Sequence, residues 1–236
     1  MCFTGIVYAA KVDTLTLTFQ ASGALWQDAL VMQDMQTKSL WSQVNGECLQ
    51  GPLKGAKLDL FPSQLTTFKA FARDFPNGEL LAKPERGPEG SAYGRYFADT
   101  KRLGIFGTRN DFAKLDGKAY VYGLRMHGRD FAVARDYLES HGWAEITVDE
   151  NEATSPRAII IYDDANNTAR AWRIEAPGDS RVEIVGDTVF VGEMARYDAR
   201  TGDPLARTQQ RLEPLPLVSS FWFAWVTFFS DTELIK

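Results

Sequence analysis

Cys2 is the first candidate for chemistry in this sequence. It stands at the start of an expected strand, next to small residues, and a thiolate in such a place can act as a nucleophile or as a soft-metal ligand. A nucleophile of this kind needs a base, and the sequence offers only His127 and His141. The alternative is that Cys2 is a small, buried apolar side chain. Cys2 is therefore the catalytic candidate, and a role as a metal ligand stays open beside it.

Tyr93, Arg95 and Tyr96 form the second candidate group. They lie within Leu81–Gly107, a segment rich in glycine and proline, and a loop of such length in a compact domain is either functional or disordered. Its aromatic content argues against disorder. Arginine offers a planar fork for a carboxylate or phosphate, and tyrosine offers an amphipathic wall. The alternative is a loop that its own aromatic side chains fix to the surface.

The composition narrows the classes of partner. The chain has 236 residues, a net charge of −5 and no basic run, so nothing favours binding to nucleic acid. The apolar run 221–229 is far shorter than the roughly 20 residues that a membrane helix needs, and the first residues do not resemble a secretory signal. Two cysteines and two histidines do not favour a zinc site of the cysteine–histidine type. Cofactor, compartment and oligomeric state stay undetermined.

The segments Lys57–Leu81 and Arg211–Ile235 resemble each other. Shifted by 154 positions, they align without a gap and share six identical residues, where unrelated segments would share roughly one or two. The identical pairs are Leu58 and Leu212, Pro62 and Pro216, Ala70 and Ala224, Phe75 and Phe229, Glu79 and Glu233, and Leu80 and Leu234. Each copy predicts a short strand that ends at a proline, a serine N-cap (Ser63; Ser219 or Ser220) and an aromatic helix. We expect these aromatic residues to form core, with the second helix buried nearly all round.

The pattern predicts an α+β fold that is rich in antiparallel strands. In it, a strand-rich unit is duplicated, and an aromatic helix closes each copy. The predicted divisions are 1–81 for the first half, 82–117 for a connecting loop of glycine, proline and aromatic residues, and 118–236 for the second half with its lead-in. The clearest strand signal is the strict alternation of Thr14–Ala21.

The second half has a lead-in, roughly Leu103–Asp149, that the first half lacks. This lead-in contains an expected strand pair, Lys118–Met126 and Arg129–Ala134. Either the first half never had such a segment, or the chain begins inside a longer protein, and we favour the second explanation. Without a lead-in, an open sheet edge is expected near Cys2, and open edges are prone to unwanted pairing.

Short motifs spread along the chain resemble one known family. They are Cys2-Phe3-Thr4-Gly5, Leu15–Phe19 with Ser22-Gly23, Leu30-Val31-Met32, Ser39–Gln43, Gly51-Pro52-Leu53 with Gly55, Tyr93-Gly94-Arg95 and Phe221–Trp225. Together they resemble a bacterial and archaeal domain of unknown function, the one numbered 3179, over nearly the whole chain. The sequence departs from that family at Phe3, where members tend to have proline, and at Thr4, where some carry a second cysteine. The resemblance implies residues before the cysteine motif and, in many members, an export signal. It implies no activity.

These observations predict a globular domain that binds a small ligand or a metal where the two halves meet, near Cys2. The predicted ligand-binding residues are Trp41, Gln43, Tyr93, Arg95 and Tyr96. Two alternatives stay open: a thiol-dependent enzyme that uses Cys2, and a protein interaction module with no small-molecule site.

Overall fold

The computed structural model describes residues 4–82, 94–105, 114–149, 155–207 and 209–236. These residues form nineteen β-strands, four short α-helices and one 3-10 turn. β10 (Arg129–Ala134) and β19 (Glu233–Ile235) pair in parallel, whereas the other paired strands of the described ranges are antiparallel. The predicted strand-rich, antiparallel architecture is therefore confirmed, and its helices are few and short.

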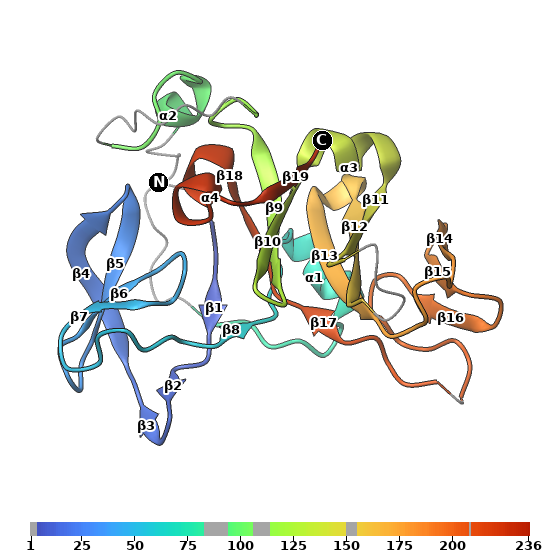
Figure 1. Cartoon of the computed structure of the whole chain (residues 1–236), viewed down its shortest axis with the longest axis horizontal. Helices are drawn as coiled ribbons and strands as arrows, with labels where there is room; N and C mark the ends of the chain where they lie inside the picture. The colour runs from blue at the N-terminus through green and yellow to red at the C-terminus, as the bar shows by residue number, and fades with distance from the viewer. Residues whose placement is uncertain (1–3, 83–93, 106–113, 150–154, 208) are drawn as a thin grey trace.

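The first strands lie together on one side of the molecule (Figure 1). One sheet runs in the order β4 (Phe19–Trp26), β5 (Ala29–Asp34), β6 (Leu40–Ser42) and β7 (Cys48–Gln50). Two smaller pairs are β1 (Val7–Tyr8) with β8 (Leu60–Phe61), and β2 (Lys11–Val12) with β3 (Leu15–Thr16). Trp41 is fully buried here, in a cluster with Leu17, Cys48 and Leu58. This cluster gives the first half its own small core.

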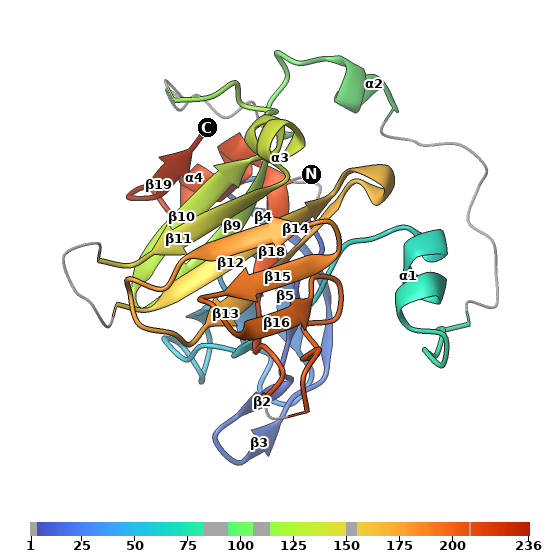
Figure 2. The same cartoon turned by 90° about the vertical axis from the view of Figure 1, so that its right-hand side faces the viewer.

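Strands from residues 118–236, which we call the second half, form two four-stranded sheets (Figure 2). One runs β18 (Leu217–Phe221), β9 (Tyr120–Met126), β10, β19; the other runs β11 (Trp143–Thr147), β12 (Arg157–Asp163), β13 (Thr168–Ile174), β17 (Pro214–Leu215). A further sheet holds β14 (Val182–Val185), β15 (Thr188–Val191) and β16 (Ala195–Asp198). Leu124 and Val133 of the first sheet share one apolar cluster with Ile146 and Ile160 of the second. The two four-stranded sheets therefore enclose a common core.

Two of the helices follow the short strands of the repeated segments. α1 spans Phe68–Asp74 and α4 spans Trp222–Phe228. The predicted serine caps are wrong. Thr67 caps α1, because its Oγ1 accepts a hydrogen bond from the Ala70 backbone N–H at 3.2 Å. Ser219 and Ser220 instead lie inside β18, where pairing with β9 keeps their backbone extended.

The two helices differ in burial. Trp222 and Trp225 of α4 are each 1% exposed, whereas Phe68 of α1 is 66% exposed. α4 lies close against β9, because Gly123 leaves room for it: a Cβ at that position would stand 2.2 Å from the Trp225 ring. The predicted burial of the second helix holds for its first turn, and its last residues are half-buried. None of the helices in the described ranges is long and apolar enough to cross a membrane.

The strands before α1 and α4 share one local geometry. Tyr8 of β1 stands opposite Leu60 of β8, and Trp172 of β13 stands opposite Pro214 of β17, which is 154 positions beyond Leu60. The Tyr8 hydroxyl donates to the Gln43 carbonyl at 2.9 Å, and the Trp172 indole donates to the Ala199 carbonyl at 3.1 Å.

Each of these rings also covers a glycine in a left-handed conformation. Tyr8 lies over Gly46 (φ 69°), and Trp172 lies over Gly202 (φ 74°). A Cβ at Gly46 would stand 2.7 Å from the tyrosine ring, and one at Gly202 would stand 2.8 Å from the indole. Only glycine satisfies both the close ring and the positive φ.

Candidate functional site

A cavity of about 610 Å³ lies between α1 and the β13–β17 pair. The first half contributes Phe61–Gln64 and Thr66, which lead into α1, and two phenylalanines of the helix region. The second half contributes Arg170–Trp172, Arg200, Arg211 and Glu213–Leu215, together with Leu217 at the start of β18. The cavity therefore lies between segments that are far apart in the sequence, 61–75 and 170–217.

The wall of the cavity is largely apolar. Phe71 and Phe75 face it from the first half, and Trp172, Leu215 and Leu217 face it from the second. Phe71 is half-buried and Phe75 is 44% exposed, so part of this apolar surface stays in contact with solvent. A ligand with an apolar body would remove that surface from water, which stabilises the complex by roughly 25 cal/mol per Å².

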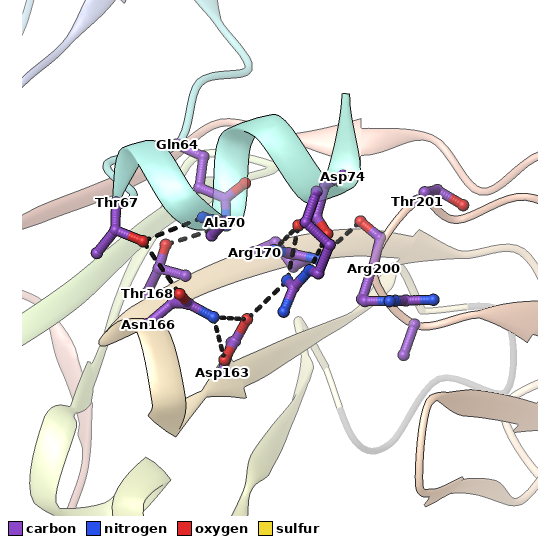
Figure 3. Close-up of polar contacts among 12 residues, drawn as sticks. Gln64, Thr67, Ala70, Asp74, Asp163, Asn166, Thr168, Arg170, Arg200 and Thr201 are labelled. Carbon is purple, nitrogen blue, oxygen red and sulfur yellow. Dashed lines mark hydrogen bonds and ion pairs between the residues drawn. The ribbon is translucent and has the colours of Figure 1, made fainter. Parts of the chain in front are cut away.

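Arg170 anchors α1 to the second half (Figure 3). Its guanidinium donates to the Asp74 carboxylate at 3.1 Å and to the Arg200 carbonyl at 2.9 Å. The Gln64 amide oxygen, turned toward it, accepts two further hydrogen bonds at 3.0 and 3.2 Å. The Arg170 and Asp74 side chains are only 9% and 4% exposed. The buried charge of Arg170 is therefore balanced by a carboxylate and satisfied by two oxygen acceptors.

Arg73 and Thr67 add a second set of contacts at the same face of α1. Arg73 binds Asp74 and also Asp163 at 3.1 Å. The Asn166 amide donates to Asp163 at 2.9 and 3.0 Å, and Thr67 donates to the Asn166 amide oxygen at 3.0 Å. We call the set Gln64, Thr67, Arg73, Asp74, Asp163, Asn166, Thr168 and Arg170 the α1 latch. Polar contacts, rather than apolar packing, hold this side of α1 to β12 and β13.

The α1 latch predicts a loss of stability in acid. The Arg73 guanidinium holds the pKa of Asp74 below its usual range against the effect of burial, and Arg170 adds to this. Burial raises the pKa of Asp163, but hydrogen bonds from Arg73 and Asn166 lower it by more than burial raises it. The pKa of Asp163 therefore also lies below its usual range. Carboxyls with lowered folded-state pKa values stabilise the fold above their ordinary pKa of about 4, and this contribution is lost as the pH falls below it.

Thermal unfolding followed from pH 7 to pH 3 measures this effect. The unfolding midpoint of the Asp163→Asn variant should fall less between pH 5 and pH 3 than that of the unchanged chain, because one of the titrating groups has been removed. Equal acid sensitivity of the two proteins would contradict the assignment of this titration to the latch.

Two arginines at the cavity have side chains that are partly exposed to solvent. Arg200 is 38% exposed and donates to Asp198 at 3.3 Å. Arg211 is 53% exposed, donates to the Thr201 carbonyl at 2.7 and 2.9 Å, and lies 3.2 Å from Asp203. Exposed ion pairs of this kind are weak, so a carboxylate or phosphate on a ligand can compete for these planar forks.

The structure places the predicted residues Trp41 and Gln43 in the first half, apart from the lining of this cavity. The Trp41 indole donates to the Asp34 carboxylate at 2.9 Å, and the Gln43 carbonyl accepts the Tyr8 hydroxyl. Burial raises the pKa of Asp34, but hydrogen bonds from Trp41 and from Thr37 and Ser39 lower it further. These contacts hold the β5–β6 turn together.

The predicted residues Arg95 and Tyr96 lie in α2 (Gly94–Ala98). Tyr96 is 5% exposed within the apolar cluster of α4, and its hydroxyl accepts the Gly104 N–H at 3.1 Å. Arg95 is exposed. Trp41 and Tyr96 thus belong to different clusters, and the structure does not bring them together. Tyr93 and Cys2 lie outside the described residues.

The remaining candidates for metal or thiol chemistry are separate from the cavity. Cys48 is a buried free thiol whose pKa is raised by burial. His141 stacks on Tyr137, and its Nδ1 lies 2.9 Å from the Tyr137 carbonyl. Within the ranges that the structure describes, no group of three or more His, Cys, Asp or Glu side chains could hold a metal ion.

The sequence interpretation missed Phe71, Arg170 and Arg200 as site residues. Phe71 lies in the aromatic helix predicted within Lys57–Leu81, but nothing in that pattern indicates that it lines a cavity. A buried arginine in an apolar strand such as β13 is a usable signal, because a buried charge needs a partner. Nothing in the sequence indicates that this partner is Asp74, almost a hundred residues earlier.

The fold is a strand-rich domain with a cavity between α1 and the β13–β17 pair. The model of one family, described as a protein of unknown function (DUF3179), matches residues 1–232, so the chain belongs to that family. The resemblance drawn from the sequence motifs is thereby confirmed. No curated protein and no solved structure matches the chain.

Proposed function

We propose that this protein is a ligand-binding domain whose ligand occupies the cavity between α1 and the β13–β17 pair. The observation that carries the proposal is the combination of an apolar wall with two partly exposed arginine side chains, Arg200 and Arg211, in one cavity of about 610 Å³. The volume lies within the usual range for ligand pockets, roughly 300–1,000 Å³. The ligand therefore combines an apolar body with an acidic group.

The same proposal includes an internal duplication of the chain. It is supported by the match of α1 to α4 and of β8 to β17 at one shift of 154 positions. It is also supported by the equal pairing registers of the two strand pairs and by the ring that covers a left-handed glycine in each half. The cavity then lies at the junction of two related units, 1–81 and 118–236, joined by 82–117.

The fluorescent probe 1-anilinonaphthalene-8-sulfonate tests the proposal, because it has an apolar body and one anionic group. We expect saturable binding to the folded protein with one site per chain. Phe75→Asp should weaken it at least about tenfold, because a lining ring becomes a charge that repels the sulfonate. Arg211→Met should also weaken it about tenfold, by removing a charge-assisted hydrogen bond.

Phe68→Asp is the matched control, because Phe68 lies on the same helix, is more exposed than Phe75 and does not line the cavity. Its affinity for the probe should stay within about twofold of that of the unchanged chain. Equal affinities of the Phe75→Asp and Phe68→Asp variants would show that the dye binds elsewhere and would refute the proposed site.

A second candidate function is a protein interaction module. It is favoured by apolar side chains that stand in solvent around α1: Phe61 is 58% exposed, Leu65 is 50% exposed and Phe68 is 66% exposed. Clustered exposed apolar side chains are typical of interaction surfaces. The thiol-dependent enzyme stays a prediction, because Cys2 lies outside the described residues.

A further inference from the structure

In the second half, the β9–β10 hairpin covers the aromatic helix α4. β9 pairs with β18 and β10 pairs with β19, so the β9–β10 hairpin lies between the two strands that flank α4 in the sequence. The Trp225 ring fills the space above Gly123, and the Arg125 guanidinium lies 4.6 Å from the centre of the Phe229 ring. The hairpin therefore supplies the two central strands of this sheet and the surface on which α4 lies.

The matching positions around α1 lack such a covering in the described part of the chain. Ser63–Thr67 corresponds to β18 and Glu79–Leu81 to β19, yet neither is a strand. The backbone groups of 63–66 and 79–81 form no backbone–backbone hydrogen bond with any residue that the structure describes. The Leu65 carbonyl accepts the Thr168 hydroxyl at 2.6 Å. Leu80 is 64% exposed and Leu81 is 92% exposed, whereas Leu234 and Ile235 at the matching positions are half-buried.

Two side chains that line the cavity correspond to side chains that contact a β-strand in the second half. Phe71 corresponds to Trp225 of α4, and Phe75 corresponds to Phe229, which directly follows α4. In the second half both of these rings contact β9. In the first half these rings line the cavity instead. The cavity is therefore the place where a β-strand lies in the second half.

We propose that the cavity beside α1 receives a β-hairpin from another polypeptide. One strand of the hairpin pairs antiparallel with Ser63–Thr67, and the other pairs in parallel with Glu79–Leu81, as β9 and β10 do with β18 and β19. This inference rests on the proposed function and the proposed duplication, because it names the occupant of the same cavity. Strand addition of this kind satisfies open backbone groups through main-chain hydrogen bonds and gains specificity from alternate side chains.

The chemistry of the hairpin follows from its surroundings. The side chains that point toward α1 are apolar, with a small residue opposite Phe71, in the way that Gly123 stands under Trp225. The partner is thus a two-stranded segment with one apolar face and a small residue opposite Phe71.

A synthetic peptide with the sequence of residues 118–135 is the probe, because that segment is the hairpin whose pairing in the second half defines the expected fit. We expect calorimetry to show one peptide bound per chain. Hydrogen exchange at the amides of Leu65 and Leu81 should slow at least about tenfold on binding, because they enter ladders. The control peptide carries Gly123→Trp and should bind about tenfold more weakly or worse, because its indole would overlap the helix.

Isolated two-stranded hairpins are marginally stable. A second experiment therefore uses a fusion protein in which a copy of residues 118–149 precedes Met1 of the full chain. The fusion should unfold at a higher temperature than the same fusion with Gly123→Trp in the added copy. Binding without protection of Leu65 and Leu81 would overturn the inference. The inference would also be overturned if the peptide does not bind and the fusion is not stabilised.

The dye and the peptide separate failure of this inference from failure of the proposed function. If the dye binds but the hairpin peptide and the fusion have no effect, the hairpin inference is refuted and the proposed ligand cavity is not. If neither the dye nor the peptide binds and the fusion is not stabilised, both proposals are refuted. Sedimentation of the free chain should show a monomer. A dimer that dissociates when the peptide is added would make a second copy of this chain the occupant and would overturn the assignment to another polypeptide.

Discussion

Replacing Arg170 with methionine should lower the free energy of unfolding by about 3–5 kcal/mol, because it leaves the buried Asp74 carboxylate without one of its two cationic partners. The Arg170 and Asp74 side chains are both less than a tenth exposed, so water is a poor replacement for the missing guanidinium. The Gln64 amide and the Arg200 carbonyl lose their donor as well. Equilibrium unfolding in urea measures the loss.

Arg73→Met is the matched control, since Arg73 also binds Asp74 but its side chain is 41% exposed. Its loss of stability should be clearly smaller, because exposed ion pairs contribute little. The double variant with Asp74→Asn isolates the pairwise interaction: the loss from Arg170→Met should shrink once the carboxylate is gone. If Arg170→Met costs no more than Arg73→Met, the latch does not hold α1 in the way described here.

Trp225→Ala should lower the free energy of unfolding by about 3–5 kcal/mol, because a fully buried ring would be replaced by a cavity next to Gly123. Trp225 is 1% exposed, and its indole donates to the Thr232 hydroxyl at 2.9 Å. The matching change in the first half, Phe71→Ala, should cost only about 1 kcal/mol, because Phe71 is half-buried and borders a hollow.

Urea unfolding of both alanine variants, with and without the 118–135 peptide, checks this difference. The cost of Phe71→Ala should rise when the peptide is present, since the ring would then be buried in the way that Trp225 is. Equal losses for the two variants in the free chain would contradict the difference in burial between α1 and α4.

The repeated segment shows how far sequence patterns reach. The spacing of the aromatic residues predicts both helices, and Pro62 and Pro216 correctly follow the short strands β8 and β17. The turn at His127-Gly128 and the strand pair around it are also as predicted. These features depend on residues close together in the chain, where local sterics and periodicity act directly.

The serine caps show where local signals fail. Ser219 and Ser220 have the chemistry of N-caps, yet they lie in β18 because β9 offers their backbone a ladder. Ser63 does not cap α1 either; Thr67 does so. A cap contributes about 1 kcal/mol, so a strand of several hydrogen bonds outweighs it.

The family, the strand-rich class and the two aromatic helices can be predicted from motifs and from the spacing of neighbouring residues. The position of α1 and the surface that it faces depend instead on contacts between residues far apart in the chain. Asp74 meets Arg170 across 96 positions of sequence, and the cavity exists because the latch holds α1 beside β13. No periodicity records such a contact, since the free energy of a buried ion pair depends on the distance and burial of its two charges in the folded chain.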